Sequence, residues 1–385
     1  MSVRHVAWAG LTLLVLALAG FGLWLSSLPV PAAVQAPPVP EAEVQAMLAS
    51  LTPPKRARPL VAVVGLNDAT ETTDYLVPTG ILRRADVADV LLLATGPGPV
   101  QLYPALAVQP DATLADFDAR HPGGADYVIV PAMRRDDDPA VLAWLRDQAG
   151  KGAIIVSVCA GAKVIAAAGL LDGRRATTHW YYLKTLLGKH PAITYVPNRR
   201  MVVDRNVATT TGITASIPMM LTLIEAMGGR QKAAEAARSL GVAQWDARHA
   251  SGAFKFTRPF AATVLGNVMS FWNREQIGIE LTPGMDEVSL ALVADAWSRT
   301  YRSRAATFAA SGAAVVESRH GIRVIPGEGA AAKKHGTASW QDRKPADALD
   351  QALADIGARY GRRTAGVVAM QLEYSGPPAQ PGAAP

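Results

Sequence analysis

Cysteine is nearly absent from this chain, which has one, Cys159, among 385 residues. A single cysteine cannot form an internal disulfide, and it leaves the redox compartment of the protein open. Closely spaced metal-ligand motifs are also missing, because the histidines stand far apart along the chain. We therefore assign no metal and no cofactor to the sequence.

Concentrated charge is also missing. Only 18% of the residues are charged, and the net charge of +6 (pI near 9.5) is spread over the chain. A nucleic-acid-binding face is normally more concentrated. The best helix candidate after residue 231 spans 286–299 and reads VSLALVADAW in its middle, an apolar packing face and not a recognition helix. We predict no specific binding to nucleic acid.

The run 6–25 contains no charged residue at all. A helix of this length spans about 30 Å, the hydrocarbon thickness of a bilayer. Arg4 precedes the run and no charge follows it until Glu41, which favours a cytoplasmic N-terminus. We predict a single-pass anchor in the inner membrane with the body on the periplasmic side. The alternative is a signal peptide cleaved near Ala33 or Ala36.

Composition divides the rest of the chain. After an anchor over 1–28, residues 29–59 contain eight prolines and predict an extended spacer. Residues 376–385 hold mainly proline, glycine and alanine and predict a disordered tail. Between them we expect an α/β domain over 60–255 and a smaller α/β domain over 256–375.

Strands and helices alternate in the first of these domains. The expected strands are apolar and rich in branched side chains: 60–66, 90–94, 127–130 and 153–158. The expected helices are 74–84, 139–149 and 162–168. This order predicts a doubly wound parallel sheet, in which ligands bind at the carboxyl ends of the strands. Asp74, Met133 and Cys159 all follow strand ends, so we expect them to meet there.

Cys159 stands at an abrupt change from strand to helix, in the sequence Cys159-Ala160-Gly161. A sharp turn of this kind holds a nucleophile exposed in a strained conformation, with small neighbours that let a substrate approach. The helix that follows would direct its N-terminal dipole at the sulfur, so we predict a lowered thiol pKa.

Three segments resemble one known family. VSVCAGAKVIAAAGLLDGRRATTHW (156–180) is similar to the cysteine turn of the ThiJ/PfpI family, within the class I glutamine amidotransferase-like superfamily. TETTDYLVPTGILRR (70–84) resembles its first helix, and the segment 198–229 resembles the part that closes its domain. The resemblance covers about 60–255 and implies a flavodoxin-like fold. The family includes isonitrile hydratases and the amidase-like domains of AraC-type regulators.

The resemblance also implies roles for individual residues. Cys159 matches the family nucleophile, Asp74 the acid that hydrogen-bonds the thiol, and His179 a histidine found near the cysteine. The backbone N–H groups of Ala160 and Met133 would form an oxyanion hole.

Each of these assignments has an alternative or a weakness. Asp74 could cap its helix, and His179 could be a packed histidine beside three aromatic residues. Pro131-Ala132-Met133 departs from the Pro-Gly-Gly of many relatives and replaces the conformational freedom of glycine with side chains. Ala160 matches neither the protease-like nor the hydratase members, so the resemblance selects no substrate.

The second half lacks a cysteine but repeats some patterns of the first. The segment 277–300 reads as strand, acidic turn and helix, and short strands are expected at 313–316 and 321–325. Helices over 346–359 and 364–374 resemble the closing pair 219–226 and 231–242. We interpret this half as a contracted copy that docks on the first like the second subunit of a dimer, so the protein is expected to be either an internal pseudo-dimer or a homodimer. An unrelated α+β appendage is the alternative.

Two functions fit these features. The first is a cysteine-dependent hydrolase, hydratase or lyase acting on a small carbonyl, amide or isonitrile compound. The second is a non-catalytic regulator that uses the same pocket for ligand binding or thiol oxidation. The sequence does not decide between an enzyme and a regulator.

Overall fold

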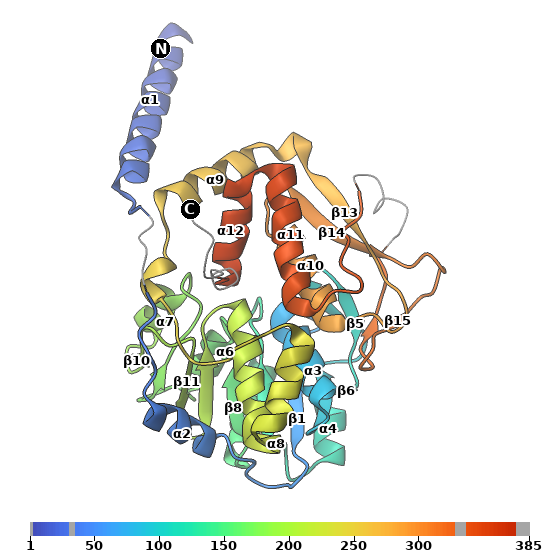
Figure 1. The fold of residues 1–385 in the computed structure, drawn as a ribbon. Coiled ribbons are helices and arrows are strands. Elements are labelled where there is room, and N and C mark those ends of the chain that lie inside the picture. The colour runs from blue at the N-terminus through green and yellow to red at the C-terminus, as the bar shows by residue number, and fades with distance from the viewer. Residues whose placement is uncertain (1–2, 31–34, 328–335, 375–385) are drawn as a thin grey trace, which may run out of the picture.

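The computed structural model describes residues 3–30, 35–327 and 336–374. Its body contains a central sheet flanked by helices, and helix α1 (Val3–Ser27) projects away from one end of it (Figure 1). The predicted tail over 376–385 lies outside the described residues.

The central sheet has seven strands in the order β11-β12-β8-β7-β1-β3-β6. Every neighbouring pair is parallel except β11 and β12, which form an antiparallel edge. The strands are β1 (Leu60–Gly65), β3 (Asp89–Ala94), β6 (Ala112–Thr113), β7 (Tyr127–Val130), β8 (Ile154–Ser157), β11 (Met201–Asp204) and β12 (Val207–Thr210). This confirms the predicted α/β class with a mainly parallel sheet.

Both faces of the sheet are covered, as a continuous apolar strand such as β1 requires. Val61 and Val63 pack into the core that contains α3 and α8, while Ala62 and Val64 face the core that contains α4, α5 and α6. The helices on the sheet are α3 (Thr72–Ala85), α4 (Leu114–Arg120), α5 (Pro139–Gly150), α6 (Gly161–Ala167) and α8 (Ser216–Leu240). A small sheet of β9 (Arg175–Ala176) and β10 (Thr194–Tyr195), with α7 (Leu183–Lys189), lies beyond α6.

The expected spacer is not extended throughout. Helix α2 (Glu41–Ser50) forms in it because the prolines stand on either side of this stretch and none stands within it. Met47 and Leu51 are buried, and Glu43 forms an ion pair of 2.7 Å with Arg199. The prediction of a spacer is therefore wrong for 41–51, which is docked on the body.

The second half contains a strand–helix–strand unit that repeats the first one. Parallel strands β13 (Glu275–Glu280) and β14 (Ser303–Phe308) flank α10 (Glu287–Ser298). Glu275 pairs with Ser303 just as Leu60 pairs with Asp89, so both units have the same register.

Unusual backbone conformations recur at matching places in the two units. Ala69 and Gly284 precede the helices with φ of 60° and 74°, and Asp86 and Tyr301 follow them with φ of 51° and 61°. The closing helices also agree. Gly229 (φ 85°, ψ 166°) bends α8, and Gly361 (φ 88°, ψ 151°) joins α11 (Pro345–Tyr360) to α12 (Arg362–Leu372). These matches support a contracted copy, while the boundaries at 60–255 and 256–375 stay predictions.

The two halves share a second sheet, in the order β15-β16-β5-β4-β2. Its strands are β2 (Asp68–Glu71), β4 (Val100–Tyr103), β5 (Ala107–Gln109), β15 (Val316–Glu317) and β16 (Arg323–Val324). Each half contributes an antiparallel hairpin, and the two hairpins join where β5 pairs with β16.

Helices α3 and α10 pack against each other in opposite directions. The N-cap of α3, Glu71, forms an ion pair with Arg299 at the end of α10. The N-cap of α10, Asp286, forms an ion pair with Arg84 near the end of α3. The ion pairs at the two ends of this helix pair are therefore reciprocal, as they would be across an approximate two-fold axis.

One described helix is long and apolar enough to cross a membrane. It is α1, where the window Gly10–Ser27 has a mean hydropathy of 1.8 and none of it is buried. Such a helix is found both in anchors and in signal sequences, so the inner-membrane location and the orientation stay predictions. Helix α9 (Arg258–Met269) begins beside its base (Figure 1), and the short η3 (Phe271–Asn273) follows the other end of α9.

Candidate functional site

Cys159 occupies the expected sharp turn between β8 and α6, with a φ of 55°. Its amide donates to Oγ1 of Thr210 (3.1 Å), and its carbonyl accepts from Oγ1 of Thr178 (3.0 Å). Gly161 is required next, because a Cβ there would lie 2.1 Å from the carbonyl oxygen of Val130. Side-chain bonds and close packing therefore hold Cys159 in a conformation that L-residues rarely adopt.

The thiol itself is buried, with 5% of Cys159 exposed. This burial raises the pKa of Cys159 well above its ordinary value, and the nearby carboxyls of Asp74, Glu71 and Glu373 raise it further. Arg299 acts in the opposite direction. The predicted lowering of the thiol pKa is therefore wrong, because desolvation outweighs the dipole of the short helix α6.

Asp74 lies in the first turn of α3 and is completely buried. Glu71 caps this helix by accepting from the amide of Asp74 (2.6 Å), so Asp74 is not the N-cap residue. Oδ2 of Asp74 accepts from the amide of Ala132 (3.1 Å), whereas Oδ1 has no hydrogen-bond partner among the described residues. Burial raises the pKa of Asp74 to about 7, although the Ala132 hydrogen bond lowers it in part.

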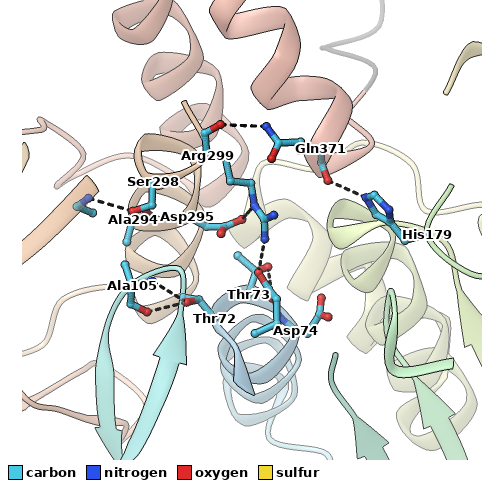
Figure 2. A network of polar contacts seen from close by, with 12 residues as sticks. Thr72, Thr73, Asp74, Ala105, His179, Ala294, Asp295, Ser298, Arg299 and Gln371 are labelled. Atoms are coloured by element: carbon cyan, nitrogen blue, oxygen red, sulfur yellow. Dashed lines mark hydrogen bonds and ion pairs between the residues drawn. The ribbon is translucent and has the colours of Figure 1, made fainter. Parts of the chain in front are cut away.

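A cluster of buried charged side chains lies close to Asp74 and joins the two halves of the chain (Figure 2). The guanidinium of Arg299 contacts Glu71 (2.6 Å) and Asp295 (2.7 Å). Burial raises the pKa of each of these two carboxyls to about 7, and Arg299 counteracts the rise in both. Because its guanidinium already has two carboxyl partners, Arg299 has little capacity left to bind an anionic ligand.

His179 is buried, and both of its ring nitrogens contact backbone groups. Nε2 donates to the carbonyl of Gln371 (2.9 Å), and Nδ1 accepts from the amide of Tyr181 (3.2 Å). Burial lowers the pKa of His179, which agrees with a neutral ring. Gln371 in turn donates to the carbonyl of Arg299 (2.9 Å), so the ring connects the Cys159 domain to α12 (Figure 2).

The two predicted oxyanion donors lie at the carboxyl ends of β7 and β8. Met133 forms a bridge with Thr70 through bonds made by the amides of Glu71 and Arg134, and the amide of Met133 takes no part in that bridge. Ala160 directly precedes α6, and both residues are buried. Their role as an oxyanion hole stays a prediction.

A cavity of about 590 Å³ lies beside the cysteine turn. Thr178, which bonds to the Cys159 carbonyl, is part of its lining, and Glu373 from the end of α12 is another part. Oε1 of Glu373 accepts from the amide of Trp180 (2.8 Å), and Oε2 lies 3.4 Å from Nε2 of His249. The second half therefore contributes both to the charges around Cys159 and to the adjacent cavity.

Sequence reasoning missed Glu71, Asp295, Arg299 and Glu373. Asp295 and Arg299 carried a local signal as an oppositely charged i,i+4 pair, but that pattern did not point to the cysteine. Asp295, Arg299 and Glu373 come near Cys159 only through the packing of the second half.

The half of the chain that carries Cys159 matches a known family. The model of the DJ-1/PfpI family matches residues 61–226. The Parkinson disease protein 7 homolog of Danio rerio is 31% identical over 180 residues, which cover 45% of this chain and 93% of that protein. The isonitrile hydratase of Pseudomonas putida is 38% identical over 161 residues, which cover 40% of this chain and 67% of that protein.

Two further comparisons match the same half of the chain. The HTH-type transcriptional regulator CdhR of Pseudomonas aeruginosa is 31% identical over 182 residues, which cover 46% of this chain and 51% of the regulator. Among solved structures, a cysteine-to-alanine mutant of a DJ-1 superfamily protein from Salmonella typhimurium is 26% identical with a TM-score of 0.43. That match covers 48% of this chain and 100% of the mutant protein.

Proposed function

Because this chain belongs to the DJ-1/PfpI family, we propose that it is an enzyme in which the Cys159 thiol adds to a small, neutral carbonyl, amide or isonitrile compound. The observation that carries the proposal is Asp74, a buried carboxyl with one unpaired oxygen and a pKa near 7, next to a cysteine held on a strained turn. A neutral substrate fits best, since Asp74, Glu71 and Glu373 would repel an anion from the sulfur.

The raised pKa of Cys159 requires that the thiol lose its proton as it attacks, and Asp74 can accept that proton. With a carbonyl substrate, the S–C bond forms while the C–O π bond opens. Asp74 then returns the proton to the substrate oxygen, which gives a hemithioacetal. The amides of Ala160 and Met133 are proposed to stabilise the charge on that oxygen.

An isonitrile can follow the same course, and a relative 38% identical is named an isonitrile hydratase. Sulfur bonds to the terminal carbon, and Asp74 delivers the thiol proton to that same carbon, which gives a thioimidate. Water then adds to the carbon, the thiol leaves with a proton, and a formamide is released. In both cases we assign His179 to positioning α12, since both ring nitrogens are occupied.

Turnover by the purified full-length chain tests this function. An alkyl isonitrile, a 2-oxoaldehyde and a primary amide would be supplied, and their products followed by NMR. We expect turnover of at least one of them, loss of it in Cys159→Ser, and a decrease of about 100-fold or more in Asp74→Asn. Ser289→Ala is the matched control, because Ser289 bonds to its N-cap residue as Asp74 does in the first half. Full activity of Cys159→Ser would refute the proposal.

The alternative is a non-catalytic sensor or regulator, and the burial of Cys159 favours it. A small molecule that protects Cys159 from alkylation but is never converted would support this second function. Slow, reversible oxidation of the thiol by peroxide, measured by intact mass, would identify it as a redox sensor.

A further inference from the structure

Helix α9 and η3 expose a group of large apolar side chains on the body. No charged residue lies between Arg258 and Arg274. The exposed large side chains of this segment range from 37% to 69% accessible: Leu265, Val268, Met269, Phe271 and Trp272. We call these five residues the α9 surface. Single exposed apolar residues are ordinary, but a contiguous group of them indicates an interaction site.

Helix α9 is apolar on its exposed side as well as at Phe260 and Ala261 on its buried side, whereas a helix on a water-soluble body normally has a polar outer face. Its buried side includes Asn267, whose amide donates to the carbonyl of Thr300 (2.9 Å) and to Oγ1 of Thr364 (3.1 Å). The side chains of Leu265, Val268 and Met269 are exposed. A polar side chain satisfied inside and apolar side chains outside suit a helix whose outer face meets lipid.

The position of α9 next to α1 indicates that the medium around its exposed apolar face is a lipid bilayer. The amide of Arg258 donates to the carbonyl of Pro29 (3.0 Å), and its guanidinium donates to the carbonyl of Ser26 at the end of α1. The rings of Trp24 and Phe256 lie 6.1 Å apart. Figure 1 shows α9 crossing the end of the body from which α1 projects. If α1 spans a bilayer, α9 lies at the surface of that bilayer.

The ends of the segment suit this position as well. Arg258 and Arg274 are both exposed, one on each side of the apolar stretch, where they can contact phosphate headgroups. Trp272 is the most exposed of the five side chains, and tryptophan is enriched at membrane interfaces.

We propose that the α9 surface inserts into the headgroup region of the same bilayer that α1 spans. The body is then fixed against the membrane at two places and cannot rotate freely on the chain after α1. The inference rests on α1 being a membrane span and is independent of the chemistry at Cys159.

Spin labelling of the full-length chain in lipid nanodiscs tests the proposal. In a Cys159→Ser background, a nitroxide would be placed at position 265 or 269, and its collisions with oxygen and with a water-soluble nickel complex compared. Position 16 in α1 reports on the span, and position 119, exposed on α4 at the far end of the body, is the control in water.

We expect high oxygen and low nickel accessibility at 265, 269 and 16, and high nickel accessibility at 119. High nickel accessibility at 265 and 269 would overturn the proposal, as would a label at 16 that is not in lipid. Low accessibility to both reagents at 265 and 269 would indicate a protein partner or a second copy, and would also overturn it.

A pair of substitutions separates insertion from mere proximity. Leu265→Glu with Met269→Glu should make a label at position 272 accessible to nickel while position 16 stays in lipid. Both side chains are exposed, so the thermal unfolding of the body should be unchanged, which checks the fold. A label at 272 that stays in lipid in this variant would contradict the role of the α9 surface.

Discussion

At the scale of single residues, Cys159 shows how burial competes with local geometry. A turn that places a thiol before a helix N-terminus normally favours the thiolate, by roughly 0.3–1 kcal/mol for the dipole. Burial acts against the charged form by up to several pKa units, and here three carboxyls add to it. The thiol is therefore protonated at neutral pH, and Asp74 becomes the group on which its reactivity depends.

This balance predicts slow alkylation of Cys159. A thiol whose folded pKa is raised is converted to the reactive thiolate only at high pH. The rate with iodoacetamide should therefore be low at neutral pH and rise only above pH 9.0, the ordinary value for this group. The rate would be measured against pH by intact mass, with glutathione as a reference thiol.

Two charge changes should shift that pH profile in opposite directions. Glu71→Gln removes a negative charge near the sulfur and should move the rise to lower pH, whereas Arg299→Gln should move it to higher pH. Near-UV circular dichroism would check that both variants are folded. Rapid labelling of the unmodified chain near pH 6 would contradict the raised pKa.

At the scale of elements, the contact between α3 and α10 joins the two halves. The helices pack tightly at Gly80, where a Cβ would lie 2.7 Å from Cγ of Glu287 and from Cγ2 of Val288. The reciprocal ion pairs Glu71–Arg299 and Arg84–Asp286 then fix the direction and the register of the pair. Packing at one glycine and charge at both ends thus define this interface.

Gly80→Ala should therefore destabilise the protein in spite of the higher helix propensity of alanine. We expect a loss of about 1–3 kcal/mol in the free energy of unfolding, because the two helices must separate. Chemical denaturation in detergent would measure it. Gly366→Ala is the matched control, since Gly366 lies in α12 with no atom within 4 Å of the added methyl. That variant should be neutral or more stable by up to about 1 kcal/mol, and equal effects at both positions would contradict the close contact.

At the scale of the whole molecule, the second half covers the first as a second subunit would. It supplies a matching strand–helix–strand unit, a hairpin that extends the sheet of the first half, and a pair of closing helices. It has no cysteine, and Ser289 occupies the place of Asp74, so it cannot repeat the proposed chemistry. It contributes Arg299 and Glu373 to the charges that surround Cys159.

Removal of this half should expose the apolar and glycine-containing face of α3. A chain that ends at residue 255 is therefore expected to self-associate through α3, because that face would otherwise meet water. Size-exclusion chromatography with light scattering, in detergent, would measure its mass. A chain that ends at residue 374 is the control and should behave as the full-length protein does. A stable monomer of residues 1–255 would contradict the covering role of the second half.

Local patterns were enough to predict much of this architecture. The buried strands β1, β3, β7 and β8, the turn at Cys159 and the helix that carries Asp74 all follow from the order of residues over short stretches. The unit at 277–300 and the paired closing helices were also visible, because strand and helix periods are properties of consecutive residues. The same local reasoning failed for α2, where a high proline count concealed ten residues that form a helix.

The sequence alone therefore determined the fold class, the position of the cysteine and the candidate acid beside it. The tertiary structure alone decided the environment of that cysteine. Glu71 and Arg299 are 228 positions apart yet form an ion pair, and the pKa of Cys159 depends on the carboxyls that packing brings together. The same holds for α9, which keeps apolar side chains on its exposed side. Which side of a helix is covered, and which charge lies beside a thiol, depend on contacts between distant segments, and no pattern of neighbouring residues encodes them.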